Sequence, residues 1–238
     1  MSNEKIAVYV WSKKIRVFHW LNVIAITLLL VIGLMILNAK LLGVSSDGKV
    51  LLKTVHVLVG YVFVANLLVR LLFGLIGKGF ERFSKTLPFY PGFTAKLHAF
   101  KKDPERAYQG HNPLGKLMVG ALFLLLTVQA TSGLVLAGTD IYYPPFGDYF
   151  AHSVALDKTQ VDLIKPYSKD NVDPEGYQAM RAFRSPFITL HVYTFYALIV
   201  LIPLHIIGVV VAEKRQRSAL VSAMINGVKY LPKDHHRH

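Results

Sequence analysis

The chain of 238 residues is 53% hydrophobic and only 17% charged, with a mean hydropathy of +0.40, which excludes an ordinary soluble domain and indicates a membrane protein. A formal net charge of +13 would suit a nucleic-acid-binding protein, but the distribution of that charge along the chain argues against one. The absence of cysteine excludes disulfides, thiolate nucleophiles, iron–sulfur clusters and cofactors attached covalently through cysteine.

Four apolar stretches predict four membrane-spanning helices. In chain order they cover residues 18–37, 51–77, 114–138 and 187–212. Each is long enough to cross a bilayer, for which about 20 residues suffice. Asn112 can cap the third helix, and Pro113 suits its first position. We therefore expect an all-α fold, an integral membrane four-helix bundle that forms a single domain over residues 1–238 with a long outer loop at 139–184.

The charged residues predict the orientation of these helices. The connection 78–116 carries eight Lys and Arg against three acids, and the tail after Ala212 carries six against two, whereas residues 139–186 hold five against seven. Basic connections stay in the cytoplasm. Both termini and the basic connection are therefore predicted to be cytoplasmic, with the acidic loop on the outer side. The charge indicates topology and membrane lipid as surroundings, and no nucleic-acid partner.

Histidines occur in three of the four apolar stretches. His191 and His205 lie on the fourth, fourteen residues apart, which places them about 21 Å apart along a helix and within about 40° of the same face. His19 and His56 lie near the starts of the first and second stretches. Because the first helix runs outward and the second and fourth run inward, His19 shares the cytoplasmic level with His205. His56 shares the outer level with His191.

Two level-matched pairs of imidazoles predict two noncovalently bound b-type haems. A lone histidine near a helix end is more often an interfacial or hydrogen-bonded residue, but four in matched pairs favour haem ligation. Zinc or copper would require ligands clustered in one small site. With both axial positions of each iron filled by histidine, the chemistry expected is electron transfer and not substrate binding at iron.

Small and basic residues near these histidines are candidate haem surroundings. Gly60 and Gly208 each follow a histidine by about one helical turn, where they leave room for a flat macrocycle or, equally, allow close helix packing. Arg70 lies within the second apolar stretch and could pair with a propionate of the inner haem, or extend its side chain to the cytoplasmic interface. Arg16 is a weaker candidate for the propionate role.

Several motifs resemble the bacterial di-haem cytochrome b561 family, which includes the cytochrome b subunits of nickel–iron hydrogenases and is similar to the formate dehydrogenase gamma subunit. The resemblance covers roughly residues 16–77 and 110–230. It rests on the His191/His205 spacing and on three motifs: Arg16-x-x-His19–Trp20-x-Asn22, Arg70–Leu71-x-Phe73-x-x-Ile76–Gly77 and Gly110–His111–Asn112–Pro113–Leu114.

This resemblance implies a quinone, menaquinone or ubiquinone, bound near the cytoplasmic haem. In the formate dehydrogenase relatives, a His-Asn pair at the start of the third helix borders that quinone. Asn112 and, second, His111 match this position, although Asn112 fits a plain helix cap equally well. The family also implies location in the bacterial inner (cytoplasmic) membrane.

The function expected is that of a membrane electron carrier between the quinone pool and a redox protein on the outer, periplasmic face. It would be an electron-transfer subunit of a quinone-linked oxidoreductase rather than an enzyme on its own. The 139–184 loop, with its Tyr142–Tyr143–Pro144–Pro145 segment, departs from the hydrogenase subunits and favours a c-type cytochrome or reductase as partner. A nickel–iron hydrogenase is the alternative partner. A haem-free membrane anchor is the alternative of another class, and it would leave four histidines without a role.

Overall fold

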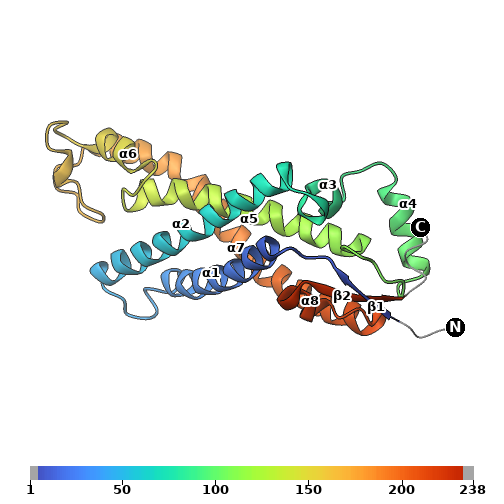
Figure 1. Cartoon of the computed structure of the whole chain (residues 1–238). Helices are drawn as coiled ribbons and strands as arrows, with labels where there is room; N and C mark the ends of the chain where they lie inside the picture. The colour runs from blue at the N-terminus through green and yellow to red at the C-terminus, as the bar shows by residue number, and fades with distance from the viewer. Residues whose placement is uncertain (1–4, 233–238) are drawn as a thin grey trace. The chain divides into compact units, whose positions relative to one another are not determined.

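A computed structural model describes residues 5–232, which are predominantly helical (Figure 1). The α-helices and strands, in chain order, are β1 (Lys5–Tyr9), α1 (Lys13–Leu37), α2 (Ser46–Ile76), α3 (Phe83–Thr86), α4 (Phe93–Lys102), α5 (Pro113–Asp140), α6 (Gly147–Val154), α7 (Pro174–Gln216), α8 (Leu220–Asn226) and β2 (Val228–Pro232). Two short 3₁₀ turns, η1 (Gly79–Glu81) and η2 (Val161–Leu163), lie in the connections.

Each of the four long helices is preceded by a capping residue, whose side chain accepts a hydrogen bond from a backbone N–H of the first turn. The donor always lies three residues further along the chain. Such caps satisfy one of the N–H groups that a helix start leaves without an intrahelical partner. The capping residues are Ser12 for α1, Ser45 for α2, Asn112 for α5 and Asp173 for α7.

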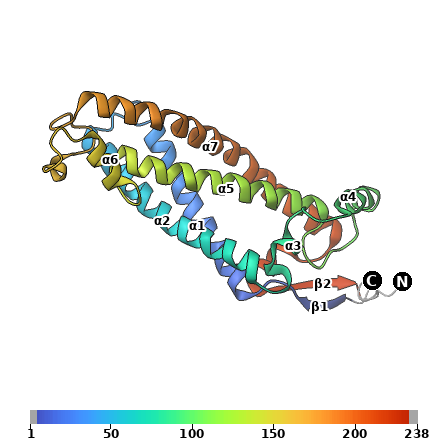
Figure 2. The same cartoon turned by 90° about the horizontal axis from the view of Figure 1, so that it is seen from above.

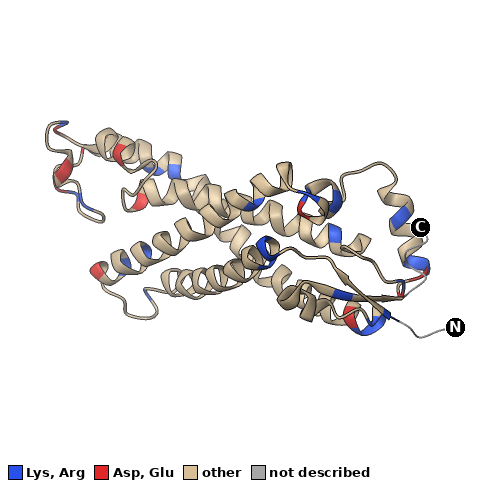
Figure 3. Cartoon of the chain, in the orientation of Figure 1, with Lys and Arg blue, Asp and Glu red and all other residues tan. Residues whose placement is uncertain are grey.

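Within residues 5–232, four helices are long and apolar enough to span a membrane, namely α1, α2, α5 and α7. Only 11% to 22% of the most apolar window of each is buried within the protein. Charged side chains are sparse along the middle of these helices and gather at their ends and in the connections (Figure 3). Helices with so much exposed apolar surface are unsuited to water, and the chain is an all-α, multi-pass membrane protein, as the sequence predicted.

The fourth long helix begins well before the apolar stretch that predicted it. α7 starts at Pro174 and spans 43 residues, or about 64 Å at 1.5 Å per residue. That length is about twice the 30 Å hydrocarbon core. Part of the predicted 139–184 loop is therefore helical, in α6 and the first turns of α7. Hydropathy missed the start of α7 because these turns carry charged residues, although Asp173 and Pro174 are a recognisable start signal.

The described chain divides into two compact units. The first unit comprises residues 5–22, 66–124 and 198–232, and the second comprises residues 23–65 and 125–197. Each long helix contributes one part to each unit. The four predicted haem ligands are distributed in pairs: His19 and His205 belong to the first unit, whereas His56 and His191 belong to the second.

The first unit contains a two-stranded antiparallel sheet that joins the first and last segments of the described residues (Figures 1 and 2). β1 pairs with β2 in a register that runs from Lys5 opposite Pro232 to Tyr9 opposite Val228. The sequence analysis did not predict this sheet. Gly227 connects α8 to β2 with φ of +88°, and a Cβ there would lie 2.7 Å from the carbonyl oxygen of Trp11, so glycine is required at this turn.

In the second unit, α6 packs against the first turns of α7 (Figure 2). Phe150 and Val154 of α6 form a buried cluster with Met180 of α7. The backbone of Ala155 pairs with that of Val172 in an isolated bridge, which closes the intervening loop. Apolar burial and backbone pairing together give the segment from α6 to the start of α7 a packed structure of its own.

Candidate functional site

His56 of α2 and His191 of α7 face each other within the second unit. The centres of their imidazole rings lie 6.4 Å apart, and the ring planes are inclined by 72°. Both side chains are half-buried, and Nδ1 of His56 is buried without a hydrogen-bond partner. Buried polar atoms without partners are rare, and a missing metal or cofactor is one of the explanations for them.

This separation fits two imidazoles that share one iron. Metal–nitrogen bonds of about 2.0 Å and about 1.1 Å from each nitrogen to its ring centre place the two ring centres about 6.2 Å apart. The observed 6.4 Å agrees with this value. The spacing of the two rings is therefore compatible with a shared iron, although Nε2 of His191 is directed to the Gln129 side chain in this structure.

His191 also contacts two polar residues of α5. Its Nδ1 lies 2.9 Å from the Ser132 hydroxyl and its Nε2 lies 3.0 Å from the Gln129 side-chain nitrogen. Ser132 is 1% exposed, and Oε1 of Gln129 is buried without a partner. Sequence reasoning missed both residues, although two polar residues at i and i+3 within an apolar stretch are a signal that could have found them.

Two glycines that sequence reasoning did not select border this pair. A Cβ at Gly33 of α1 would lie 3.6 Å from Cε1 of His56, and one at Gly133 of α5 would lie 3.3 Å from Cε1 of His191. The second distance is closer than most Cβ contacts. Gly133 thus allows α5 to approach the His191 ring directly.

The two glycines that the sequence did single out have different surroundings. A Cβ at Gly60 or at Gly208 would meet no atom within 4 Å. Neither glycine is therefore needed for close packing against another helix within this structure. A flat macrocycle requires open space beside the helix that carries its ligand, and both glycines have such space. Their role in making room for a haem stays a prediction.

In the first unit, His19 of α1 and His205 of α7 lie close enough to interact electrostatically. The His19 ring stands edge-on to Trp20, with the ring centres 5.4 Å apart. Nδ1 of His19, like that of His56, is buried without a partner. Two imidazoles on different helices of one unit are a donor set of the kind that a haem iron uses.

Arg70 is also buried in the first unit, with only 3% of its surface exposed. Its guanidinium donates to the backbone carbonyl of Glu81 at 2.9 Å and lies within 6 Å of three phenylalanine rings, those of Phe18, Phe83 and Phe123. The side chain is enclosed by aromatic faces, which attract a cation. Arg70 is thus packed inside the protein, and its contact with Phe18 joins it to the turn of α1 that carries His19.

The first turns of α1 are attached to α8. The Arg16 guanidinium donates to the backbone carbonyl of Ile225, and the Trp20 indole donates to that of Met224 at 2.8 Å. Nε of Arg16 is buried without a partner. Arg16 therefore has a structural partner in this unit, and its Nε remains free to donate to another group. Its role beside a haem stays a prediction.

Two asparagines within the apolar helices also pair in the first unit. The Asn66 side chain donates to Oδ1 of Asn22 and to the carbonyl oxygen of Phe18, both at 3.1 Å. This pair fixes α2 against the turn of α1 that carries His19. Asn22 belongs to the His19 motif, whereas Asn66 was missed.

His111 and Asn112 precede α5 in the first unit. Asn112 is the helix cap, because its Oδ1 accepts from the backbone N–H of Gly115 at 2.7 Å. The His111 ring lies against Trp11, with the ring centres 4.8 Å apart. Burial is the main reason that the pKa of His111 falls to about 3, and nearby positive charges add to this effect: Lys229, His205, Lys116 and Arg70.

Lys229 of β2 was not anticipated as part of this region. Its ammonium donates to the carbonyl oxygens of Tyr108 and Gly110, at 3.2 and 2.7 Å, and lies 5.5 Å from the centre of the Trp11 ring. The residue is 2% exposed, and burial lowers its pKa to about 8. The last strand therefore holds the segment that leads into His111.

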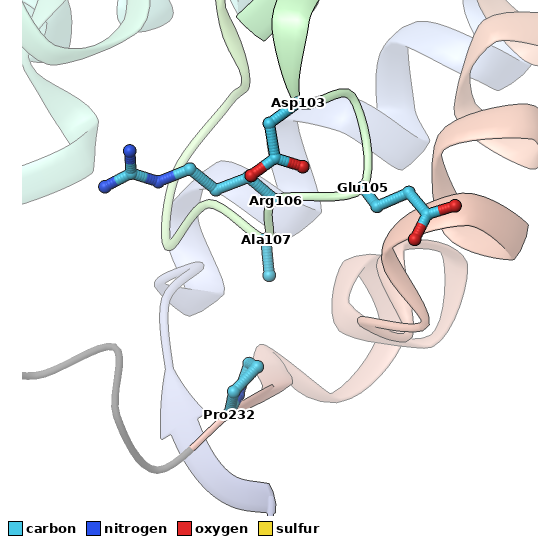
Figure 4. Close-up of a pocket in the computed structure, with 5 residues that line it drawn as sticks. All are labelled: Asp103, Glu105, Arg106, Ala107 and Pro232. Carbon is cyan, nitrogen blue, oxygen red and sulfur yellow. The ribbon is translucent and has the colours of Figure 1, made fainter. Parts of the chain in front are cut away.

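A surface pocket elsewhere in the first unit does not coincide with any predicted site. It has a volume of about 360 Å³ and is lined by Asp103, Glu105, Arg106, Ala107 and Pro232 (Figure 4). The side chains of Glu105 and Arg106 point in opposite directions and do not converge on a ligand (Figure 4). Among residues 5–232, no three His, Cys, Asp or Glu side chains gather as a metal site would require.

Comparison with known proteins shows which proteins the chain is similar to. A probable Ni/Fe-hydrogenase B-type cytochrome subunit of Bradyrhizobium diazoefficiens is 25% identical over 232 residues, which cover 92% of this chain and 85% of the relative. The corresponding protein of Rhodobacter capsulatus is 23% identical and covers 94% and 82%. A probable Ni/Fe-hydrogenase 1 B-type cytochrome subunit of Escherichia coli is 24% identical over 62% of this chain and 68% of the relative.

No solved structure matches the chain. The family model of prokaryotic cytochrome b561 matches residues 10–227, which include all four paired histidines. The chain is thus a membrane cytochrome b with b-type haem, an electron carrier. It belongs to the prokaryotic cytochrome b561 family.

Proposed function

We propose that this protein carries electrons through two b-type haems, one ligated by His56 and His191 and the other by His19 and His205. The observation that carries the proposal is the 6.4 Å separation of the His56 and His191 rings, which suits a shared iron. The proximity of His19 to His205 supports the second site. Each haem would supply reversible one-electron chemistry, and the protein would hold it by ligation and packing.

Arg70 is proposed to stabilise the inner haem through a propionate. Its guanidinium has donors beyond the one used by the Glu81 carbonyl, and it lies against Phe18, the neighbour of His19. A buried cation in a poorly solvated site favours an anionic partner. Arg16, with its buried unpartnered Nε, would serve as a second donor.

We place the quinone near His111 and Asn112. Because His111 stays neutral at physiological pH, its imidazole can donate a hydrogen bond to, or accept one from, a quinone oxygen. Reduction of one quinone takes up two electrons and two protons, and the protons would be exchanged on the cytoplasmic side. Asn112 uses one oxygen lone pair for the helix cap, and its amide N–H groups can bind the ligand.

The redox partner that we propose is a nickel–iron hydrogenase, which would deliver electrons on the outer face of the bacterial inner membrane. The matched relatives are named as B-type cytochrome subunits of such enzymes and cover most of this chain. These names favour the hydrogenase over the c-type cytochrome or reductase expected from the 139–184 loop. Membership of a cytochrome family also disfavours a haem-free anchor.

The haem content of the purified protein tests the ligand assignment. We expect two b haems per chain by pyridine haemochrome, and one after His56→Ala or His19→Ala. The exposed residues His152 and His98 provide matched controls, whose alanine variants should keep both haems. Retention of two haems in His56→Ala would refute the proposed pairing.

The quinone site has a separate test. Asn112→Ser keeps a capping oxygen but removes the amide donors. We expect reduction of the haems by quinol to slow about tenfold, the equivalent of one lost hydrogen bond, while reduction by dithionite is unchanged. An unchanged rate with quinol would exclude Asn112 from the site. Copurification with hydrogenase subunits in the native host tests the partner independently.

A further inference from the structure

The Ser132 hydroxyl determines which nitrogen of His191 carries the proton. Ser132 Oγ lies 2.7 Å from the carbonyl oxygen of Val128 and 2.9 Å from Nδ1 of His191. A hydroxyl has one proton to donate, and a carbonyl can only accept it. The bond to His191 must then run in the other direction, with Nδ1–H donating to Ser132 Oγ.

The second contact of His191 leads to the same tautomer. The Gln129 side-chain nitrogen, 3.0 Å from Nε2 of His191, can only donate. Nε2 therefore carries a lone pair and no proton. The two residues of α5 together hold His191 as the Nδ1–H tautomer, in which Nε2 is the nitrogen available to a metal.

We propose that Ser132 is a positioning residue for the outer haem, which orients the His191 ring and increases its basicity as a ligand through the Nδ1–H bond. The inference rests on the proposed ligation of haem by His191. A metal-bound histidine commonly donates its other N–H to an oxygen of the protein, and this bond fixes the ring and makes the ligand a stronger donor. A stronger donor stabilises ferric iron and lowers the potential of the haem.

The contact between Gln129 and His191 cannot persist in the haem-bound protein. One lone pair on Nε2 serves either the Gln129 amide or the iron. Gln129 must therefore turn away when the haem binds, whereas the bond to Ser132 on the other side of the ring is unaffected. This difference makes Ser132, and not Gln129, the residue that acts on the bound haem.

The predicted effect concerns His191, because the Nδ1 atoms of His19 and His56 lack a comparable hydrogen bond. Nδ1 of His19 and Nδ1 of His56 are both buried without a partner, so neither ring has the support that Ser132 gives His191. Ser132 also belongs to the second unit, whereas His19 and His205 belong to the first. The inner haem is therefore an internal reference for the experiment.

The test is a redox titration of both haems in the full-length protein. The His56→Ala variant, which should lose the outer haem, first shows which absorbance and electron paramagnetic resonance signals belong to each haem. In Ser132→Ala, the midpoint potential of the outer haem should rise and its low-spin electron paramagnetic resonance signal should shift, while the inner haem is unchanged. Ser132→Thr keeps an oxygen acceptor and should restore the wild-type potential. Thr139→Val is the matched control, since Thr139 of α5 is equally buried and its hydroxyl donates only to Val135.

An unchanged outer potential in Ser132→Ala, or equal shifts of both haems, would overturn the inference. The same shift in Thr139→Val would also overturn it. If Ser132→Ala loses the outer haem, Ser132→Thr decides: retention at the wild-type potential supports the inference, and loss refutes it. Retention of both haems in His191→Ala would instead refute the ligation itself, and with it the role of Ser132.

Discussion

Lys229 shows how one buried cation organises the region around His111. Its ammonium is 2% exposed and donates to two backbone carbonyls on either side of Gln109, those of Tyr108 and Gly110. Lys229 is far more buried than the exposed lysines of the 78–116 connection. Burial disfavours the charged form and lowers the pKa of Lys229 to about 8. The local structure is therefore stabilised when the solution becomes alkaline.

The sign of this pH dependence can be measured. The unfolded chain, with an ordinary lysine pKa of about 10.4, binds a proton more readily than the folded protein between pH 8 and that value. The free energy of unfolding should therefore increase from about pH 8 to pH 10. Thermal unfolding followed by tryptophan fluorescence should show this increase in the wild type and a smaller one in Lys229→Met. The exposed Lys214→Met should behave like the wild type, and equal slopes in all three proteins would contradict the prediction.

Gly60 and Gly208 allow each predicted haem to be tested from its surroundings. A Cβ meets no protein atom at either position, so alanine should leave the helices undisturbed. If a macrocycle lies beside each glycine, Gly60→Ala should weaken retention of the outer haem and Gly208→Ala that of the inner haem. Each variant is the control for the other when haem content is measured during detergent dilution. Unchanged retention of both haems would assign these glycines to contacts outside the haem sites.

At the scale of the elements, the helix ends are held by a few charged contacts. Asp140, the last residue of α5, forms ion pairs with Lys53 of α2 and, at 2.8 Å, with Arg184 of α7. Lys53 also lies 5.0 Å from the centre of the Tyr167 ring. Because all three charged side chains are mostly shielded from solvent, this network contributes more than a surface ion pair would.

Asp140→Asn should destabilise the second unit. The substitution leaves the two cations without their carboxylate, and we expect a loss of about 1.5–3 kcal/mol, the range for hydrogen bonds to charged groups. The unfolding temperature and the release of the outer haem on heating report this loss. Asp162→Asn, at an exposed position that makes none of these contacts, provides the matched control. A stability equal to that of the control would show that the network contributes little.

At the scale of the whole molecule, the antiparallel pairing of β1 with β2 brings residues 5–9 together with residues 228–232. An even number of membrane spans requires both ends to lie on the same side, and the sheet agrees with this requirement. Which side that is remains the prediction of the positive charges. The natural absence of cysteine makes the chain well suited to a labelling test.

Single cysteines on each side should report the orientation. Phe89, in the basic connection, is 82% exposed, and Leu156, after α6, is 68% exposed. In intact cells stripped of their outer membrane, a membrane-impermeant maleimide should label Leu156→Cys but not Phe89→Cys, and both should react after lysis. The reverse pattern would invert the topology and exchange the inner and outer haem assignments.

Hydropathy predicted the four spans, histidine spacing predicted the candidate ligands, and the motifs around His19, Arg70 and His111 together with that spacing indicated the family. Each of these signals lies within a single helix, where the period of 3.6 residues determines which side chains share a face. They can therefore be detected without knowledge of the tertiary structure. The charged start of α7 and the strands β1 and β2 were missed for the same reason. Neither has an apolar period, and the two strands are stabilised only by pairing across almost the whole length of the chain.

The sequence by itself determined the class of the protein, because apolar length and charge asymmetry act locally and need no partner. Only the tertiary structure decided the surroundings of each candidate residue. The contact of Ser132 with His191, the enclosure of Arg70 by phenylalanines and the attachment of Lys229 beside His111 join residues distant in sequence. The direction of a hydrogen bond and the burial of a charge depend on such neighbours, and folding alone brings them together.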